Sequence, residues 1–424
     1  MAPKYDYDAI IIGTGPVGLM AALALLRLNL KIAVCGPFPR KENAHGAPCD
    51  PKNDSRTAAL LNTSATILSQ LDLWSTLGET ASPVRGIRLV DDLGRLPRAP
   101  EVLFQASDVD AEQLAWNISN TDIVCQLSQK LHDIADRTQN CQIIRDILVD
   151  QVKCAPSHAV IQLSDGQTYR AKLVVGADGR RSRARLGAGI KTTDWTYNQR
   201  ALTTQFAHSR PHHDISTEFH RPSGPLTVVP MAGRRSSLVW VTTTDEMAGL
   251  EKLSEEQFAA ALEEKLQGLL GTTADFSPRT SVPLSAMLVD TFAQKRVILA
   301  GEAAHVLPPI GAQGLNLGIR DVAVLSDCVQ NALRTTTDIG GTTVTETYHQ
   351  RRRQDVWLRT HGVDLLNRSL STTILPVNLA RGLALHAANA VPLLRQLMIE
   401  GGMATIKATD GRDETRSTMS WNTC

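Results

Sequence analysis

Several features are absent or scarce in this chain of 424 residues, and each absence excludes a class of protein. The seven cysteines are scattered and show no C-x-x-C spacing, so neither a disulfide framework nor a zinc site is expected, and a reducing compartment is favoured. No apolar run approaches the ~20 residues of a membrane span, because Arg27 ends the run that begins at Gly18. The acidic N-terminus lacks the basic region of a signal peptide. These absences predict a cytoplasmic protein.

An excess of charge of either sign is also absent. The 44 basic and 43 acidic residues give a formal net charge of +1, whereas a dedicated nucleic-acid binder carries a large basic excess, so no nucleic-acid partner is expected. Apolar residues make up 42% and charged residues 21%, which excludes a disordered chain. The length allows two or three domains of ~100–200 residues each, or one composite fold.

The first thirty-odd residues have the pattern of strand, turn, helix and strand. Residues 9–12 and 31–34 are short apolar runs, Gly13-Thr-Gly-Pro-Val-Gly18 is the turn, and residues 19–28 favour a helix. In a dinucleotide-binding unit Gly13, Gly15 and Gly18 allow a tight turn, approach of a pyrophosphate and contact between helix and strand. The phosphate is then bound by free N–H groups at the helix start. A glycine-rich turn without a ligand is the alternative, but the strand and helix on either side favour dinucleotide binding.

One residue of such a unit is missing. Its second strand normally ends in an acidic residue that binds the ribose, but this chain has Gly36 there. Glu42 is a loose candidate for the role, and a backbone or water contact is the alternative.

The rest of the chain alternates between two kinds of pattern. Strand-like runs at 173–177 and 296–300 end in Asp178-Gly179 and Gly301-Glu302, and a helix is expected from about residue 315. Residues from about 195 to 245 alternate as in antiparallel sheet, and 250–270 form an amphipathic pattern. We therefore predict an α/β fold with a Rossmann-like domain built from discontinuous segments, an inserted antiparallel-sheet domain and a helical tail. The predicted bounds are 1–80, 108–187 and 284–345 for the first domain, 81–107 and 188–283 for the second, and 346–424 for the tail.

Two of these segments resemble motifs of the FAD-dependent aromatic hydroxylases. Gly176-Ala-Asp-Gly-Arg-Arg-Ser182, with Arg185, is similar to the Asp-Gly motif of that family, and the stretch from Arg296 to Asp321 is similar to its second flavin motif. The particular residues of the second motif are typical of the branch that hydroxylates ubiquinone precursors. The stretches Trp195–Ala201, Gly224–Pro230 and Ser237–Trp240 support the same branch.

The resemblance implies a set of residues that bind FAD. Arg56 would bind the pyrophosphate, and Asp178 would contact flavin and pyridine nucleotide. N–H groups from Gly311 onward would face the flavin edge where negative charge accumulates on reduction, with Asn316 as a further donor and Pro308 as a stiff wall. The implied residues are Gly13, Gly15, Pro16, Gly18, Arg56, Asp178, Gly179, Gly301, Glu302, Pro308, Gly311, Gln313, Gly314 and Asn316.

The chain departs from the family pattern at two of these positions. Glu302 stands where the family usually has Asp, so the carboxylate expected near the ribityl chain is one methylene longer. The order Gly311-Ala312-Gln313-Gly314 replaces Ala-Gly-Gln-Gly and places a methyl group where the backbone approaches the flavin ring.

Several of these residues also have structural interpretations. Arg56 could be a surface arginine, and Asp178 a turn aspartate before glycine. His305 is either a general base or a packed, hydrogen-bonded histidine, and the sequence does not decide between them. No side chain is assigned as certainly catalytic; His305 and Pro308 are the candidates near the flavin.

Other groups of residues suggest sites for which a simpler interpretation is preferred. The spacing of four histidines fits no metal site, so no metal is expected and surface-loop histidines are favoured; they are His208, His212, His213 and His220. Arg351–Arg353 is interpreted as a solvated helix face, with an anionic docking patch as the alternative. The apolar but interrupted segment 374–398 is interpreted as short packed helices, with an interfacial helix as the alternative.

The resemblance implies an FAD-dependent monooxygenase. FAD would be reduced by NAD(P)H and react with O2 to a C4a-hydroperoxide, which would hydroxylate the aromatic ring of a prenylated phenol or quinol in ubiquinone biosynthesis. A soluble phenolic substrate, or a non-catalytic prenyl-binding protein on the same scaffold, are the alternatives. A hydrophobic prenylated substrate would also bring peripheral contact with the inner membrane, or with other proteins of that pathway.

Overall fold

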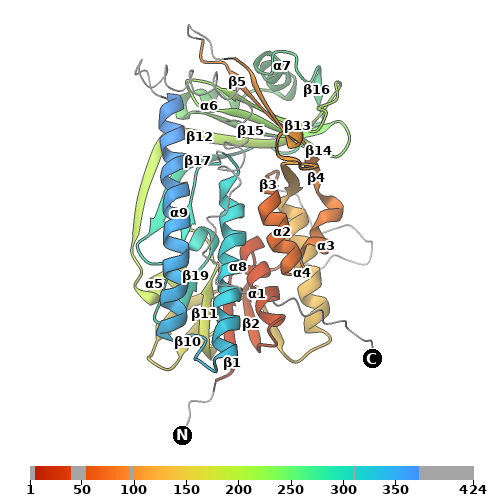
Figure 1. Ribbon diagram of the computed structural model, residues 1–424. Helices are drawn as coiled ribbons and strands as arrows, with labels where there is room; N and C mark the ends of the chain where they lie inside the picture. The colour runs from red at the N-terminus through yellow and green to blue at the C-terminus, as the bar shows by residue number, and fades with distance from the viewer. Residues whose placement is uncertain (1–4, 40–53, 95–99, 310, 372–424) are drawn as a thin grey trace, which may run out of the picture.

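The computed structural model describes residues 5–39, 54–94, 100–309 and 311–371, and its two large sheets lie one above the other (Figure 1). We call them the lower sheet and the upper sheet. The lower sheet contains β1 (Tyr7–Ile12), β2 (Ile32–Gly36), β8 (Cys141–Arg145), β9 (Val149–Cys154), β10 (Ala159–Leu163), β11 (Thr168–Gly176), β18 (Ala293–Gln294) and β19 (Val297–Leu299). The upper sheet contains β5 (Gly86–Asp91), β6 (Val102–Gln105), β12 (Thr192–His208), β13 (Ile215–His220), β14 (Leu226–Met231), β15 (Arg235–Thr243), β16 (Thr273–Ala274), β17 (Thr280–Val289) and β20 (His305–Val306).

The centre of the lower sheet is parallel. β1 pairs in parallel with both β2 and β11, β2 pairs with β8, and β11 pairs with β19. The core strands are almost wholly apolar, because a parallel sheet with helices against it is buried on both faces. Helices α1 (Pro16–Leu26), α4 (Asn120–Ala135) and α8 (Gln313–Arg334) pack together around it, with α1 in contact with the other two.

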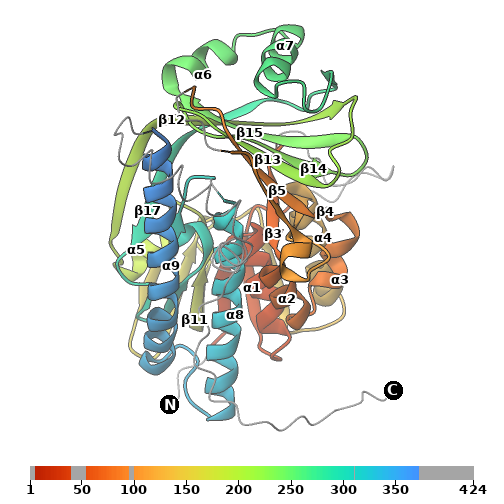
Figure 2. The same ribbon diagram turned by 45° about the horizontal axis from the view of Figure 1, so that its top comes forward.

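The upper sheet has two chemically different faces. Its outer face carries Phe206, Leu238 and Trp240, which pack with Met247 of α6 (Thr244–Leu250) and Phe258 of α7 (Glu255–Lys265). These two helices cover the sheet from above (Figure 2). The inner face carries a separate apolar group formed by Ala201, Val241 and Leu284, together with Tyr197 and Val239.

A small antiparallel sheet joins the two large ones. It consists of β3 (Thr57–Leu61), β4 (Ser82–Val84) and β7 (Ala115–Ser119), which adjoins α2 (Asn62–Gln70) and α3 (Trp74–Leu77). The Thr57 hydroxyl lies 2.8 Å from that of Ser237, and the Asn117 amide donates to the Pro230 carbonyl at 2.9 Å. These contacts turn the inner face of the upper sheet toward the lower half of the molecule.

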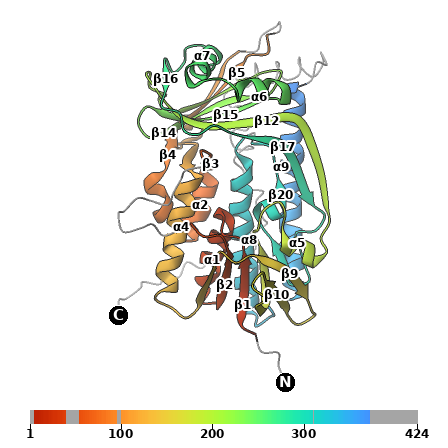
Figure 3. The ribbon, with the colours of Figure 1, turned by 180° about the vertical axis from the view of Figure 1, so that it is seen from behind.

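Helix α9 (Thr342–Ser371) runs beside both sheets (Figures 1 and 3). At its lower end Tyr348 is fully buried and donates to the Leu299 carbonyl at 2.9 Å. Near its upper end Asp364 accepts a 2.6 Å hydrogen bond from Tyr197 of β12. The helix therefore fixes the upper sheet relative to the lower one.

The fold class predicted from the sequence is confirmed. The N-terminal strand–helix–strand unit is β1–α1–β2, and the segments expected after it supply the neighbouring parallel strands β11 and β19. The domain bounds stay a prediction. The helix expected over 250–270 is shorter: α6 ends at Leu250, and α7 begins after Ser254, which caps it. α5 (Arg183–Ala188) follows the Asp-Gly turn.

Cys125 is disulfide-bonded, although the scattered cysteines gave no reason to expect a disulfide, whereas Cys35, Cys141, Cys154 and Cys328 are free. Spacing in the sequence cannot show which distant cysteines approach each other. Among the described helices, none combines the length and the apolar character needed to cross a membrane.

The interpretation of Arg351–Arg353 as a solvated helix face is wrong for its central residue. Arg352 is 2% exposed, and its guanidinium lies 2.6 Å from Asp321 of α8 and 2.7 Å from Asp355 one turn along α9. Burial favours the neutral form of Asp321, but the charges of His305 and Arg352 outweigh it and hold its pKa below the ordinary range. Only Arg353 of the three is exposed. The partner on α8 could not be seen in the local sequence.

Replacing Arg352 with methionine would remove the cation shared by two buried carboxylates; Asp355 would keep Arg320 and Arg359, but Asp321 would keep only its contact with His305 among the ion pairs of the described residues. We expect Arg352→Met to lower the free energy of unfolding by about 3–5 kcal/mol. The neighbouring exposed variant Arg353→Met should change it by less than about 0.5 kcal/mol. Urea unfolding of both variants checks this, and equal stabilities would contradict the buried network.

Candidate functional site

The first glycine motif forms the turn between β1 and α1. Gly13 has φ of +112°, and a Cβ there would lie 2.2 Å from the Ala177 carbonyl oxygen. A Cβ at Gly18 would lie 2.1 Å from the Gly13 carbonyl oxygen. Both positions therefore require glycine for packing alone, independently of any ligand.

Gly15 differs from these two glycines. It is the residue before α1, its backbone is extended, and no atom lies within 4 Å of the place a Cβ would occupy. Pro16 begins the helix, and no side chain caps its N–H groups. These free donors and the open space in front of them suit the phosphates of a dinucleotide.

The backbone conformation at Gly36 explains why the acidic residue expected to bind the ribose is absent. Gly36 ends β2 with φ of +152°, and a Cβ would lie 3.1 Å from the Thr14 side chain. A residue with a side chain is therefore disfavoured at the place where an acid is expected. Glu42, the candidate replacement, lies outside the described residues.

Arg56 is paired with Asp54 and lies within electrostatic range of Glu302 from a distant segment. Arg56 forms two hydrogen bonds to Asp54, at 2.7 and 2.8 Å, and its side chain is 53% exposed just before β3. These bonds raise its pKa first, and the charge of Glu302 raises it further. The fork of the guanidinium is thus held in place at the surface, where it can bind an anionic ligand. That it binds the pyrophosphate stays a prediction.

Asp178 has the contacts of a structural aspartate. One carboxylate oxygen accepts from the Ser182 hydroxyl at 2.5 Å, and the other accepts from the backbone N–H groups of Arg183 and Ala184 at 2.6 and 3.2 Å. It therefore shapes the start of α5. The next residue, Gly179, has φ of +73° and open space at its Cβ position.

The second flavin motif packs directly against the first. Gly301 has φ of +61°, and its Cβ would lie 3.0 Å from Val17 of α1. In the first turns of α8, a Cβ at Gly318 would lie 2.5 Å from the same valine. Glu302 is exposed beside Gly301, and Pro308 is buried further along. The two glycine motifs, separated by about two thirds of the chain, form one packed unit.

The N-terminus of α8 is a second candidate anion site. Gly311 and Ala312 both have positive φ, of +64° and +53°, and no side chain caps the helix. No atom lies within 4 Å of the Cβ position of Gly314. Gln313 accepts a hydrogen bond from Arg359 of α9 at 3.1 Å. Ala312 therefore has a left-handed backbone conformation, which costs an alanine about 1–2 kcal/mol.

Asn316 does not have the role expected for it. Its amide nitrogen donates to the Ala59 and Ala312 carbonyls at 2.8 and 2.6 Å, and its oxygen accepts from Leu61 and Ser64 at 3.0 and 2.6 Å. Both amide hydrogens are thus used within the protein, so the side chain has none left for a flavin. It instead joins the start of α8 to β3 and α2.

His305 has the packed, hydrogen-bonded arrangement. It lies on β20, its side chain is 1% exposed, and its Nε2 is 2.7 Å from the Asp321 carboxylate. The same carboxylate oxygen accepts from the Gly301 N–H at 2.8 Å. These contacts favour a positioning role in the second motif. In the sequence Asp321 is visible only as the last residue of that motif, and no local pattern indicates its link to Arg352.

The four other histidines do not share one environment. His208 and His220 are buried at 5% exposure each, so the surface-loop interpretation is wrong for them, whereas His213 is exposed. Both nitrogens of His212 are hydrogen-bonded to backbone groups of Met231 and Asp214. No cluster of metal-binding side chains occurs in the described part of the chain.

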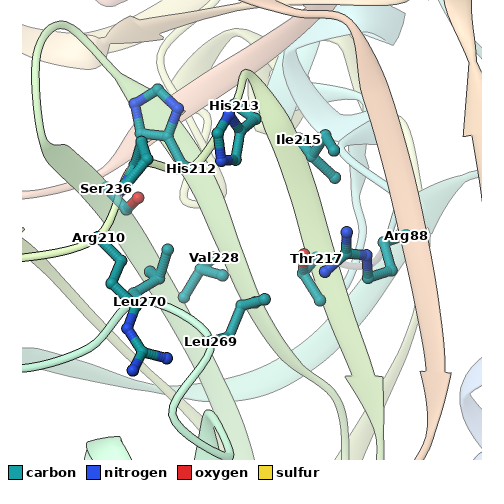
Figure 4. A pocket seen from close by; sticks show the side chains of 11 residues that line it. Arg88, Arg210, His212, His213, Ile215, Thr217, Val228, Ser236, Leu269 and Leu270 are labelled. Atoms are coloured by element: carbon teal, nitrogen blue, oxygen red, sulfur yellow. The ribbon is translucent and has the colours of Figure 1, made fainter.

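One pocket of about 310 Å³ lies between the upper sheet and the loop before β16 (Figure 4). Val228 and Leu270 on its wall belong to the core under α7, so the pocket opens on the outer face of the upper sheet. The glycine motifs lie below the inner face. This pocket is therefore separate from the candidate flavin site.

Comparison with known proteins identifies the family. Residues 6–362 match the FAD binding domain family. The chain belongs to this family. It is 33% identical to "Ubiquinone hydroxylase UbiL" of Rhodospirillum rubrum over 94% of this chain and 90% of that protein. It is 27% identical to "3-demethoxyubiquinol 3-hydroxylase" of Escherichia coli over 92% of this chain and 96% of that protein.

The solved structures show the same fold. The chain resembles p-nitrophenol 4-monooxygenase PnpA from Pseudomonas putida with a TM-score of 0.74 and 18% identity, over 95% of this chain and 99% of that one. The family and these relatives make the chain an FAD-dependent monooxygenase. The open glycines at the starts of α1 and α8 fit the cofactor.

The contrast between Gly15 and Gly18 gives a test of the cofactor site. Gly15→Val should abolish FAD retention, measured by the visible absorbance of the purified protein, while the free energy of unfolding of the apoprotein changes by less than about 1 kcal/mol. Gly18→Ala should instead cost about 1–3 kcal/mol or more through its backbone clash. Unchanged flavin content in Gly15→Val would make the first motif purely structural.

Proposed function

We propose that the chain hydroxylates the aromatic ring of a prenylated phenol or quinol in ubiquinone biosynthesis, with FAD, O2 and NAD(P)H. The two hydroxylases named above act on ubiquinone or its precursors by their names, and each matches this chain over nine-tenths or more of both sequences. The structural observation that carries the proposal is the packed unit of α1 and α8. Both helices begin without a side-chain cap, and no atom lies within 4 Å of the Cβ positions of Gly15 and Gly314 at their starts.

Each part of this unit would contribute in a different way. The N–H groups at the start of α1 would hold the pyrophosphate, with Arg56 as the added cation. Glu302 would accept hydrogen bonds from the ribityl hydroxyls. The N–H groups at the start of α8 would stabilise negative charge on the flavin ring. FAD, when bound, supplies the activation of O2, and the protein supplies orientation and exclusion of water.

A prenylated substrate is supported by the inner face of the upper sheet. The apolar group of Ala201, Val241 and Leu284, with Tyr197 and Val239, faces the half of the molecule that carries the glycine motifs. The first three are already buried, so an isoprenoid chain would bury its surface on the two partly exposed side chains, Tyr197 and Val239, at about 25 cal/mol per Å². This composition favours the prenylated substrate over a hydrophilic phenol.

The substrate class can be tested with the holoenzyme. We expect the purified protein to show an oxidised-flavin spectrum, and prenylated phenols to stimulate NAD(P)H oxidation and O2 uptake with formation of a hydroxylated product. Hydrophilic phenols without the prenyl chain serve as the control and should give at least about tenfold lower kcat/KM. A colourless protein that cannot be reconstituted with FAD would contradict the proposal.

A peripheral membrane contact is the second part of the proposal. The outer side of α9 exposes Trp357 by 52%, Leu358 by 57% and Leu365 by 70%. The cations Arg353 and Arg368 lie exposed at either end of this stretch. Apolar side chains between cations suit the surface of an anionic bilayer, from which a prenylated substrate would be drawn. The apolar segment 374–398 follows, but it lies outside the described residues.

This contact can be measured by sedimentation with anionic phosphatidylglycerol vesicles. The triple variant Trp357→Ser, Leu358→Ser, Leu365→Ser should bind roughly 100-fold more weakly, because about 1 kcal/mol of apolar transfer is lost at each position. Leu186→Ser removes an equally exposed leucine elsewhere and should bind like the native chain. Native vesicle binding by the triple variant contradicts the contact, and a change only in oligomeric state would assign the stretch to a second copy.

A further inference from the structure

A buried histidine and a partly buried glutamate form a pair on the upper sheet, and neither the glycine motifs nor the flavin motif includes it. Glu218 and His220 alternate along β13, so their side chains share one face. Thr217 lies between them and lines the pocket on the outer face. The pair therefore lies on the inner face.

Strand register places the pair opposite the small sheet. Glu218 is paired with Thr227 of β14, Thr227 with Val239 of β15, and Val239 with Thr203 of β12. Register partners point to the same face, so these side chains form one row. At the end of this row the Ser55 hydroxyl donates to the Thr203 carbonyl at 3.2 Å, directly before Arg56. The row thus faces the half of the molecule that carries the candidate flavin site.

The pair has a defined orientation. His220 Nε2 lies 2.8 Å from a Glu218 carboxylate oxygen, and Thr227 donates to the other oxygen at 3.2 Å. Burial favours the neutral form of Glu218, but His220 and Thr227 outweigh it and lower its pKa. An ionised carboxylate only accepts, so Nε2 carries the hydrogen and Nδ1 presents its lone pair.

The lone pair of Nδ1 has no partner. His220 is 5% exposed, and its Nδ1 is buried without a hydrogen bond among the described residues. A buried polar atom left unpaired costs about 1–3 kcal/mol, which a donor on a bound ligand would recover. The apolar group of the same face provides surroundings for a hydrophobic ligand beside this acceptor.

We propose that His220, oriented by Glu218, is the base that accepts the proton of the substrate's phenolic hydroxyl during hydroxylation. This inference rests on the proposed function. The O–H bond breaks, the proton forms a new N–H bond at Nδ1, and the electron pair stays on the substrate oxygen. A phenolate ring is more electron-rich and is therefore a better acceptor of an electrophilic oxygen atom. The proton returns to the oxygen when the hydroxylated product leaves, so the step adds no net proton to the reaction.

Glu218 would compensate the positive charge that the buried imidazole gains with the proton. The imidazolium formed at His220 would lie beside a carboxylate that stays ionised, as in other histidine bases oriented by an acid. On the neighbouring strand β5, Asp91 is the register partner of His220. The next residues along the two strands, Asp92 and Arg221, form an ion pair at 2.9 Å.

His305 has a similar unpaired Nδ1 but does not suit the same role. Its partner Asp321 is already compensated by Arg352 and also accepts from the Gly301 N–H. His305 therefore belongs to the packing of the second motif, whereas the cation that pairs with the Glu218 carboxylate among the described residues is His220.

The first experiment compares pH profiles of hydroxylation by the holoenzyme. His220→Gln should lower kcat/KM for a prenylated phenol about 100-fold at neutral pH. The loss should shrink as the pH rises toward the pKa of a free phenol, about 10, because the substrate then ionises in solution. Glu218→Gln should show a smaller loss with the same pH dependence.

His208→Gln is the matched control. His208 is equally buried in the same sheet, but both of its nitrogens are hydrogen-bonded, to Arg210 and Ser236. It should keep the native pH profile. A native profile in His220→Gln, or a loss that is equal at every pH, would overturn the inference, since the second result indicates a structural role only.

A binding experiment separates this inference from the proposed function. 4-Nitrophenol absorbs differently as phenol and phenolate, so difference spectra report its ionisation when bound. The native holoenzyme should bind it as the phenolate at a pH where free probe is mostly neutral, and both His220→Gln and Glu218→Gln should reduce this shift. A native shift in both variants would overturn the assignment. Failure of the native enzyme to hydroxylate any prenylated phenol, with the shift intact, would instead contradict the proposed function.

Discussion

One buried carboxylate connects the parts of this molecule. Asp321 of α8 accepts hydrogen bonds from the Gly301 N–H and His305, and its other oxygen binds Arg352 of α9. A carboxylate with no exposure is stable only if such partners compensate its charge. The turn of the second flavin motif, the helix that begins beside it and the long helix across both sheets are therefore held by one group.

The glycines show how this packing leaves space for a cofactor. At four glycines the place of a Cβ is already occupied, either by a backbone carbonyl or by Val17. These glycines are Gly13, Gly18, Gly301 and Gly318. Gly15 and Gly314 are open positions at the starts of two helices. The filled glycines bring α1 and α8 together, and the open ones leave N–H groups facing outward. A single motif thus combines structural and ligand-binding residues, and only the open ones bear on cofactor affinity.

The two faces of the upper sheet have different roles. The outer face supplies the core with α7, and the inner face combines apolar side chains with the Glu218–His220 pair. Such a surface suits a substrate that is hydrophobic over most of its length and has an ionisable ring at one end. In the proposed reaction the cofactor would supply the oxidation, and the Glu218–His220 pair would set the ionisation state of the ring.

The sequence by itself determined the fold class and the family, because strand periodicity, glycine spacing and the order of three motifs are local patterns. It placed Gly15 and Gly314 correctly at helix starts, because a turn that excludes side chains requires glycine and is therefore visible in the residue types. The tertiary structure decided the roles of Asn316 and Arg352, whose partners come from segments far along the chain. A polar side chain can face solvent, a ligand or a buried partner, and its free energy differs among these by several kcal/mol. That choice depends on packing between distant elements, which no local pattern of residues contains.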